Sequence, residues 1–166
     1  GEILVDGQAD FALMFNPGHR RELFVRAHKE IPLGFITPPD HPVGALESAP
    51  FSLCAEYPVV IPAPPLALWR PLELLEAETG LKIQAVGRAD NIQMIKSLVS
   101  AGVGIGVLSY LDVYDEVQKN QLAFTPILHK KLSPVTLALC VDRSRQLSMA
   151  ARLIISEIEQ FFADQL

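Results

Sequence analysis

The middle of the chain alternates between short apolar runs and segments with helical spacing. Residues 57–61 form a β-branched run that stops at Pro62-Ala63-Pro64-Pro65, which predicts a strand followed by a break. Residues 66–78 then space their apolar side chains as a helix does, and Gly80 is placed to end that helix. Residues 82–86 alternate polar and apolar positions, which predicts a second strand.

The same alternation of strand and helix continues beyond residue 90. Asp90-Asn91 is a natural N-cap for a helix over residues 92–101, and Gly102 is suited to its far end. Residues 103–108 contain no polar side chain, as expected of a parallel strand that is covered on both faces. The order strand–helix–strand–helix–strand predicts βαβ units, a mostly parallel sheet and hence an α/β fold.

The segments on either side of this region add further elements. Strands are predicted over residues 9–15, 23–28, 33–37, 122–127 and 135–141, and helices over residues 111–119 and 147–162. Residues 47–54 fit either a strand or a helix. The 13 prolines gather at strand ends, so they punctuate a compact fold rather than form a linker.

Composition narrows the class of protein. The 166 residues are 49% hydrophobic and 20% charged, which describes a globular chain with a large buried fraction and excludes a disordered tail. The net charge of −5 comes without a basic stripe, which argues against sequence-independent binding of nucleic acid by this chain. We expect a cytoplasmic protein that makes no membrane contact, since no apolar run reaches about 18 residues and the first residues lack a signal-peptide pattern.

The residues that carry enzyme chemistry do not form a recognisable constellation, and we expect no catalytic residue, no metal and no cofactor. The sequence has no Gly-x-Ser-x-Gly motif, and its four histidines show no metal-ligand spacing. The run Gly102-Val-Gly-Ile-Gly106 follows a helix and opens a strand, whereas a phosphate-binding loop follows a strand and opens a helix. The acids Glu73, Glu76 and Glu78 fit a solvated helix face.

Cys54 and Cys140 stand in apolar surroundings, which favours reduced core cysteines; a disulfide or a redox switch is the alternative.

A binding site is predicted from geometry. Ligands of open α/β sheets sit beyond the carboxyl ends of parallel strands, near helix N-termini that favour an anion. The segments 62–65, 88–91 and 108–110 each follow a predicted strand in this way. Two alternatives stay open here: Asp90 and Asn91 could serve only as a helix cap, and Arg88 could pair with Asp90 rather than with a ligand. Trp69 fits core or rim packing as well as ligand contact.

Several motifs resemble one family in their order along the chain. Val5-Asp-Gly-Gln-Ala-Asp-Phe-Ala-Leu13 resembles the family's L-x-x-G-x-x-D-x-A-I strand entry, and Leu33-Gly-Phe-Ile-Thr-Pro-Pro-Asp-His-Pro42 resembles its strand ending in P-x-H-P-L. The run 57–61, followed by Arg70 in the next helix, and the segment 95–109 resemble later family motifs, the last of them the LVAAGxGIAxLP hallmark. From about residue 4 to the end, the chain resembles the effector-binding domain of LysR-type transcriptional regulators.

The resemblance implies a two-lobed domain with the fold of type 2 periplasmic binding proteins. One lobe would hold residues 1–54 plus 142–166 and the other residues 55–141, with crossings near residues 51–57 and 135–141. The family's opening strand–helix–strand has no counterpart here, so we expect the first lobe to be incomplete and the chain to be part of a longer protein.

The resemblance also implies where a small effector would bind, namely in the cleft between the lobes. The family's contact positions correspond here to Thr37, to Pro62, Ala63 and Pro64, and to Asp90 and Asn91. Ser109 replaces the family's usual proline at the end of its motif.

The function implied is the ligand-sensing part of a regulator that binds a small, anionic effector. Such regulators form dimers or tetramers and contact DNA through a helix-turn-helix domain that this chain does not contain. A solute-binding protein of a transporter is the alternative, and a prephenate-dehydratase-like lyase on the same bilobal fold, with Asp90 as its one candidate acid or base, is a third.

Overall fold

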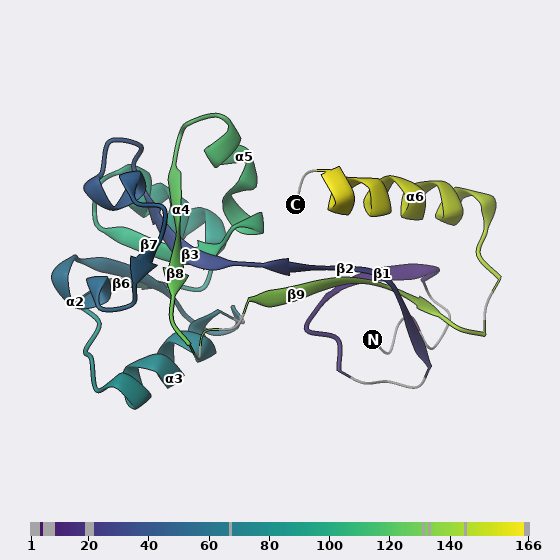
Figure 1. Ribbon diagram of the computed structural model, residues 1–166, viewed down its shortest axis with the longest axis horizontal. Helices are drawn as coiled ribbons and strands as arrows, with labels where there is room; N and C mark the ends of the chain where they lie inside the picture. The colour runs from purple at the N-terminus through teal and green to yellow at the C-terminus, as the bar shows by residue number, and fades with distance from the viewer. Residues whose placement is uncertain are drawn as a thin grey trace. The chain divides into compact units, whose positions relative to one another are not determined.

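The computed structural model describes residues 4, 9–18, 22–66, 68–130, 132, 134–144 and 146–164. The chain forms two compact units, drawn in Figure 1. Unit 1 comprises Gly1–Ile31 and Pro134–Leu166, and unit 2 comprises Pro32–Ser133. Each unit has its own sheet.

Unit 1 is built on an antiparallel sheet of three strands in the order β1-β9-β2. Its elements are β1 (Phe11–Phe15), β2 (Leu23–Ile31), β9 (Val135–Asp142) and α6 (Met149–Asp164). Helix α6 runs along the sheet in Figure 1. Its buried residues, Ala151, Ile155 and Phe162, all lie on one side of the helix. Two polar contacts attach it to β2, from Arg26 to Glu159 at 3.0 Å and from the Lys29 ammonium to the Phe162 carbonyl at 3.2 Å.

Unit 2 is built on a sheet of six strands in the order β4-β8-β3-β7-β5-β6. The strands are β3 (Leu33–Thr37), β4 (Ala49–Pro50), β5 (Val59–Pro62), β6 (Ala85–Ala89), β7 (Ile105–Ser109) and β8 (Ala123–Leu128). The helices are η1 (Pro42–Ala45), α2 (Leu53–Glu56), α3 (Trp69–Thr79), α4 (Ile92–Ser100), η2 (Leu111–Val113) and α5 (Tyr114–Gln118). The predicted α/β fold is confirmed, and the parallel pairings of the described strands all lie in this sheet.

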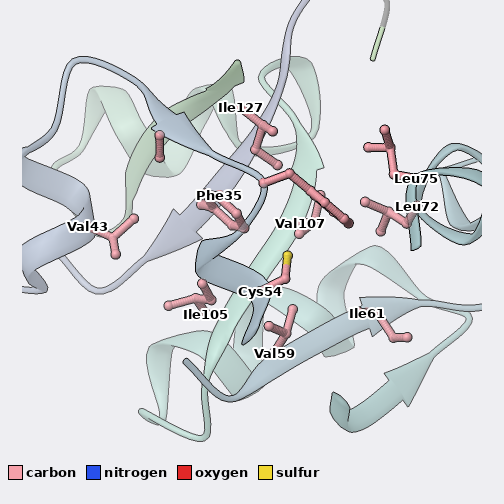
Figure 2. Close-up of a cluster of buried hydrophobic side chains, with 12 residues drawn as sticks. Phe35, Val43, Cys54, Val59, Ile61, Leu72, Leu75, Ile105, Val107 and Ile127 are labelled. Carbon is pink, nitrogen blue, oxygen red and sulfur yellow. The ribbon is translucent and has the colours of Figure 1, made fainter. Parts of the chain in front are cut away.

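The central strands of unit 2 are buried on both faces. Alternate residues of a strand point to opposite faces. Phe35 and Val107 therefore join the cluster of Figure 2, into which Leu72 and Leu75 point from α3, while Ile36 and Leu108 join a second cluster under α4. The apolar run at residues 103–108 predicts this two-sided covering, and it is found over Ile105–Ser109; Val103 is exposed and lies before the strand.

The predicted βαβ region is confirmed as β5–α3–β6–α4–β7. Strand β5 pairs in parallel with both β6 and β7. Asn91 is the N-cap of α4, and Gly80 ends α3 in the left-handed conformation with φ 66°.

The second strand of that region, predicted over residues 82–86, is found at Ala85–Ala89 instead. Ile83, the first apolar residue of the predicted alternation, lies before the strand and packs against the core cluster that contains Leu72 and Leu75 of α3. The ambiguous residues 47–54 hold the short strand β4 and the start of α2.

The boundary between the compact units differs from the lobe boundary that the resemblance implied. The units divide at residues 31/32 and 133/134, not at 54/55 and 141/142. Residues 32–54 belong to unit 2 because β3 pairs with β7 and β8 in the middle of its sheet. Residues 135–141 belong to unit 1 because β9 pairs with β1 and β2.

The glycines at the start of β7 allow close packing. A Cβ at Gly104 would lie 2.5 Å from the Pro58 carbonyl oxygen, and one at Gly106 would lie 2.7 Å from Ile36. The run 102–106 therefore serves strand packing after a helix, as its order in the sequence indicates.

No helix within the described part of the chain is long and apolar enough to cross a membrane.

Candidate functional site

The carboxyl ends of β5 and β6 bring together five of the six predicted site residues. Pro62, the last residue of β5, pairs with Ala89, the last residue of β6, and the Ala63 N–H donates to the Ala89 carbonyl at 2.9 Å. Pro64 follows on one side, and Asp90 and Asn91 follow on the other. Two parallel strands that end side by side form the kind of edge at which α/β sheets bind ligands.

Thr37, the sixth predicted residue, lies at the opposite edge of the same sheet. Strand β3 runs antiparallel to β7, with Leu33 opposite Ser109 and Ile36 opposite Gly106. The carboxyl end of β3 is therefore level with the amino ends of β7 and β5, roughly 10 Å along the strands from Pro62 at about 3.3 Å per residue.

The Thr37 side chain is buried and has no access to solvent or to a ligand. The residue is 1% exposed, and its hydroxyl oxygen has no hydrogen-bond partner among the described residues. A Cβ on Gly44 would lie 2.8 Å from that oxygen, so the backbone of η1 covers it.

Asn91 is occupied as a helix cap. Its side-chain oxygen accepts the N–H groups of Gln93 at 2.8 Å and of Met94 at 3.2 Å. Two of the first amides of α4 are therefore already satisfied within the chain, which weakens the attraction of this helix end for an anion. Asp90 is exposed beside it.

A cavity of about 260 Å³ lies next to this edge, between α3 and the strands β5 and β6. We call it the α3 crevice, and its lining is Ile61, Pro62, Pro64, Trp69, Leu72, Glu73, Glu76, Ile83 and Arg88. Ile61 and Leu72 are buried, and Figure 2 shows them on β5 and α3 respectively. The crevice thus combines an apolar floor with one aromatic and three charged side chains.

The charged side chains of the α3 crevice differ in their bonding. The Glu76 carboxylate accepts the Ile83 N–H at 3.0 Å, which ties the helix to the segment before β6. Glu73 and Arg88 are exposed, and no hydrogen bond or ion pair occupies either side chain in the described structure. With two carboxylates and one guanidinium, the lining carries a formal charge of −1 at neutral pH.

The sequence predicts that Glu73, Glu76 and Glu78 belong to a solvated helix face, and Glu73 and Glu78 are indeed exposed, while Glu76 is half-buried. That prediction does not include the lining of the α3 crevice by Glu73 and Glu76. Trp69, Leu72, Glu73 and Glu76 fall at positions i, i+3, i+4 and i+7 of α3, so they share one side of the helix. The sequence signal was the continuation of an apolar face by acids at the same helical spacing.

The carboxyl end of β7 is hydrogen-bonded to a side chain of η2, the next element. Asp112 accepts hydrogen bonds from the Ser109 hydroxyl at 2.6 Å and from the Ser109 N–H at 3.1 Å. Nearby, the buried Lys96 ammonium contacts Glu116 at 2.6 Å. Burial would raise the pKa of Glu116, but the hydrogen bond and charge of Lys96 outweigh it and hold that pKa below its usual value.

A second cavity, of about 530 Å³, lies in unit 1. It opens over β2 and β9 and is lined by Leu23, Val25, His28, Thr136, Ala138 and the turn 16–18. None of the predicted site residues lies there.

The two cysteines are free and buried, as predicted. Burial and the neighbouring charge of Glu76 raise the pKa of Cys54 to about 12, and burial raises the pKa of Cys140. Both thiols are therefore protonated and unreactive at neutral pH. No group of three metal-ligating side chains occurs among the residues that the structure describes.

The chain is similar to known proteins both in a family model and in solved structures. The model of the family described as the LysR substrate binding domain matches residues 2–163. No curated protein sequence matches the chain.

Solved structures share the fold at low sequence identity. The regulatory domain of Synechocystis CcmR, solved in complex with 2-PG, is 15% identical with a TM-score of 0.70, and the match covers 99% of this chain and 78% of that one. The effector binding domain of QuiR, in complex with shikimate, is 14% identical with a TM-score of 0.67, covering 99% and 77%.

A putative LysR family regulator from Pseudomonas aeruginosa, 15% identical with a TM-score of 0.68, is matched over 98% of this chain and 57% of its own. The chain therefore spans little more than half of that protein.

Proposed function

The chain belongs to the LysR substrate-binding domain family, and from that premise we propose that it is the ligand-sensing part of a DNA-binding transcriptional regulator. The observation that carries the proposal is the family match over residues 2–163. The proposed role is regulatory rather than catalytic, with a small molecule as the signal. Neighbours of the same fold were solved with 2-PG and with shikimate, which supports a small-molecule effector here as well.

The proposed effector site is the carboxyl edge of β5 and β6, formed by Pro62, Ala63, Pro64, Asp90 and Asn91. The pairing of Pro62 with Ala89 supports it, since this pairing makes the two loops neighbours. Thr37 is left out of the proposal because the register of β3 puts it at the other edge. An effector with an anionic group fits the edge through Arg88, the cationic side chain of the adjoining crevice.

In the proposal, effector binding shifts the conformational equilibrium of the protein that carries this domain. A ligand can shift a conformational equilibrium only by its difference in affinity for the two states, and a tenfold preference corresponds to about 1.4 kcal/mol. In the proposal the larger protein works in the cytoplasm as a homodimer or tetramer and reads DNA through a separate helix-turn-helix domain.

A thermal-shift screen tests the proposal. The panel contains shikimate, 2-PG, benzoate, citrate and inorganic phosphate, and we expect at least one of them to raise the melting temperature. A ligand at a hundred times its Kd stabilises the folded state by about 2.7 kcal/mol, which corresponds to several degrees.

Variants then locate the site. We expect Ala63→Glu to abolish the shift, because it places a carboxylate at the proposed edge, and Arg88→Gln to abolish it, because it removes the cation proposed to pair with the anion. Thr37→Val at the opposite edge and Asp115→Ala on α5 serve as controls and should respond like the parent chain. If all four variants respond like the parent, the site assignment fails; if no member of the panel shifts the melting temperature, the proposal of an anionic effector fails.

A further inference from the structure

The α3 crevice carries both acidic and basic side chains beside its apolar lining. We propose that it binds a small aromatic molecule that carries both an anionic and a cationic group, with Trp69 against the ring, Arg88 on the anion and Glu73 on the cation. This inference rests on the proposed function and specifies the chemical class of ligand for the same region of unit 2.

The apolar lining of the crevice favours a ligand that has an apolar group. Ile61 and Leu72 are buried at its floor, Ile83 is half-buried beside them, and Trp69 stands half-buried at the first residue of α3. An aromatic ring placed against an indole gains both area burial and a favourable ring–ring geometry. At about 260 Å³ the cavity is close to the lower end of the range of small-molecule sites, so the ligand is small.

The charges of the crevice argue against a purely anionic ligand. Arg88 offers a planar fork of donors that suits a carboxylate. Glu73 and Glu76 line the same cavity, and an anion without a compensating cation meets both carboxylates. Of the two acids, Glu76 accepts the Ile83 N–H through Oε1, whereas no hydrogen bond in the described structure involves the Glu73 carboxylate, so we assign the cationic group to Glu73.

The two charged partners come from different elements, which separates their roles. Arg88 belongs to β6, where it pairs in register with Ile61 of β5, and Glu73 belongs to α3. The N–O distance between them exceeds that of an ion pair, since no such pair joins them. A ligand that spans the crevice with opposite charges can satisfy both side chains at once.

Trp69 makes the inference directly measurable, because it is the only tryptophan in the sequence. Excitation at a wavelength that tyrosine does not absorb therefore reports on this crevice alone. The probes share one carbon skeleton: L-phenylalanine carries both charges, 3-phenylpropionate only the anion, and 2-phenylethylamine only the cation. None of them contains an indole that would add emission of its own.

We expect L-phenylalanine to change the Trp69 emission in a saturable way, with an affinity about tenfold or more above that of either single-charge probe, as expected for the loss of one charge-assisted hydrogen bond. Glu73→Gln should remove the advantage of phenylalanine over phenylpropionate, and Arg88→Gln its advantage over phenylethylamine. Glu47→Gln, an exposed acid elsewhere in unit 2, is the matched control and should leave all three affinities unchanged.

The outcomes separate this inference from the proposed function. If phenylpropionate binds as tightly as phenylalanine, recognition of two charges is wrong, although the domain still senses an anion. If none of the three probes changes the emission of Trp69, the crevice is not an aromatic site, and a thermal shift with another compound would leave the proposed function standing. Circular dichroism of each variant shows that a lost response does not come from unfolding.

Discussion

The two units bury their strands differently. In unit 2 every residue of β3 and of β7 is buried, because helices cover both faces of the sheet. In unit 1, β1 leaves Leu13 and Phe15 49% and 48% exposed. The comparison shows that the apolar content of a strand does not by itself determine how much the strand stabilises the protein. An apolar side chain adds little to the free energy of unfolding where it stays exposed to solvent.

The largest expected contrast comes from truncating a phenylalanine in each unit. Phe35→Ala removes a fully buried ring from the core of unit 2 and should lower the free energy of unfolding by about 4 kcal/mol, through lost burial and the cavity left behind. Phe15→Ala removes a half-exposed ring in unit 1 and should cost less than about 1 kcal/mol. Urea unfolding of both variants measures the difference, and equal losses would contradict the contrast between the units.

Adding a methyl group tests the same contrast from the other side. Gly104→Ala in unit 2 brings a Cβ to 2.5 Å from the backbone oxygen of Pro58, which cannot move without disturbing β5, and we expect a loss of about 2 kcal/mol. Gly18→Ala in unit 1 meets nothing within 4 Å. Its melting temperature should stay within about a degree of that of the parent chain, since open surface positions tolerate such changes. A stable Gly104→Ala variant would show that β5 and β7 are less tightly packed than described.

Two threonines of unit 2 should respond to the same substitution with opposite signs. Thr37→Val removes a buried hydroxyl that has no partner in the described structure, and should stabilise the chain by about 1 kcal/mol. Thr125→Val removes a hydroxyl that donates to the Val43 carbonyl at 2.7 Å, and should destabilise it by about 1 kcal/mol. Chemical denaturation of the pair checks both signs. A loss of stability in Thr37→Val would mean that its hydroxyl has a partner, such as a bound water.

The smallest effect concerns pH and His41. Burial lowers the pKa of His41 below 6.5, and its Nδ1 accepts the Val43 N–H at 3.2 Å as the cap of η1. As the pH falls through 6.5 the unfolded chain takes up the proton first, so unit 2 loses stability from about pH 6.5 down to the lowered pKa of the folded state and is then insensitive to this group.

The check is a comparison of urea midpoints between pH 8 and pH 5 with those of His41→Asn, which keeps a side-chain acceptor at the cap without titrating. The variant should lose part of the slope below pH 6.5. An identical pH profile in both proteins would remove His41 from the account.

Local patterns predicted most of the fold. The strand over residues 33–37, most of the strand predicted over 103–108 and found at Ile105–Ser109, and the cap at Asn91 could be predicted because burial on two faces and helix capping leave marks in adjacent residues. The predicted start of β6 is three residues too early because Ile83 is apolar for packing against the cluster that contains Leu72 and Leu75, not for pairing in the sheet.

The candidate site was less predictable because it depends on the direction of strands that are distant in sequence. The sequence shows that Thr37 ends a strand, but not that this strand runs against β7, and that direction alone separates Thr37 from Pro62. Glu73 and Arg88 likewise line one crevice because α3 packs against the cluster that includes Ile61 of β5, the strand next to β6, and no local pattern encodes that packing.

The position of β5 between β6 and β7 separates the residues that can contact a ligand from those that form the core. The chain leaves β5 to one side to form β6 and returns past it to form β7 on the other side, so the carboxyl end of β5 is a topological switch point. The loops that follow β5 and β6 start side by side there and lead to different helices, α3 and α4. Ala63, Pro64, Asp90 and Asn91 lie in the loops beyond the strands, so they can be exchanged without altering the buried residues of β5 and β6, and one scaffold can acquire a new ligand while its core stays the same.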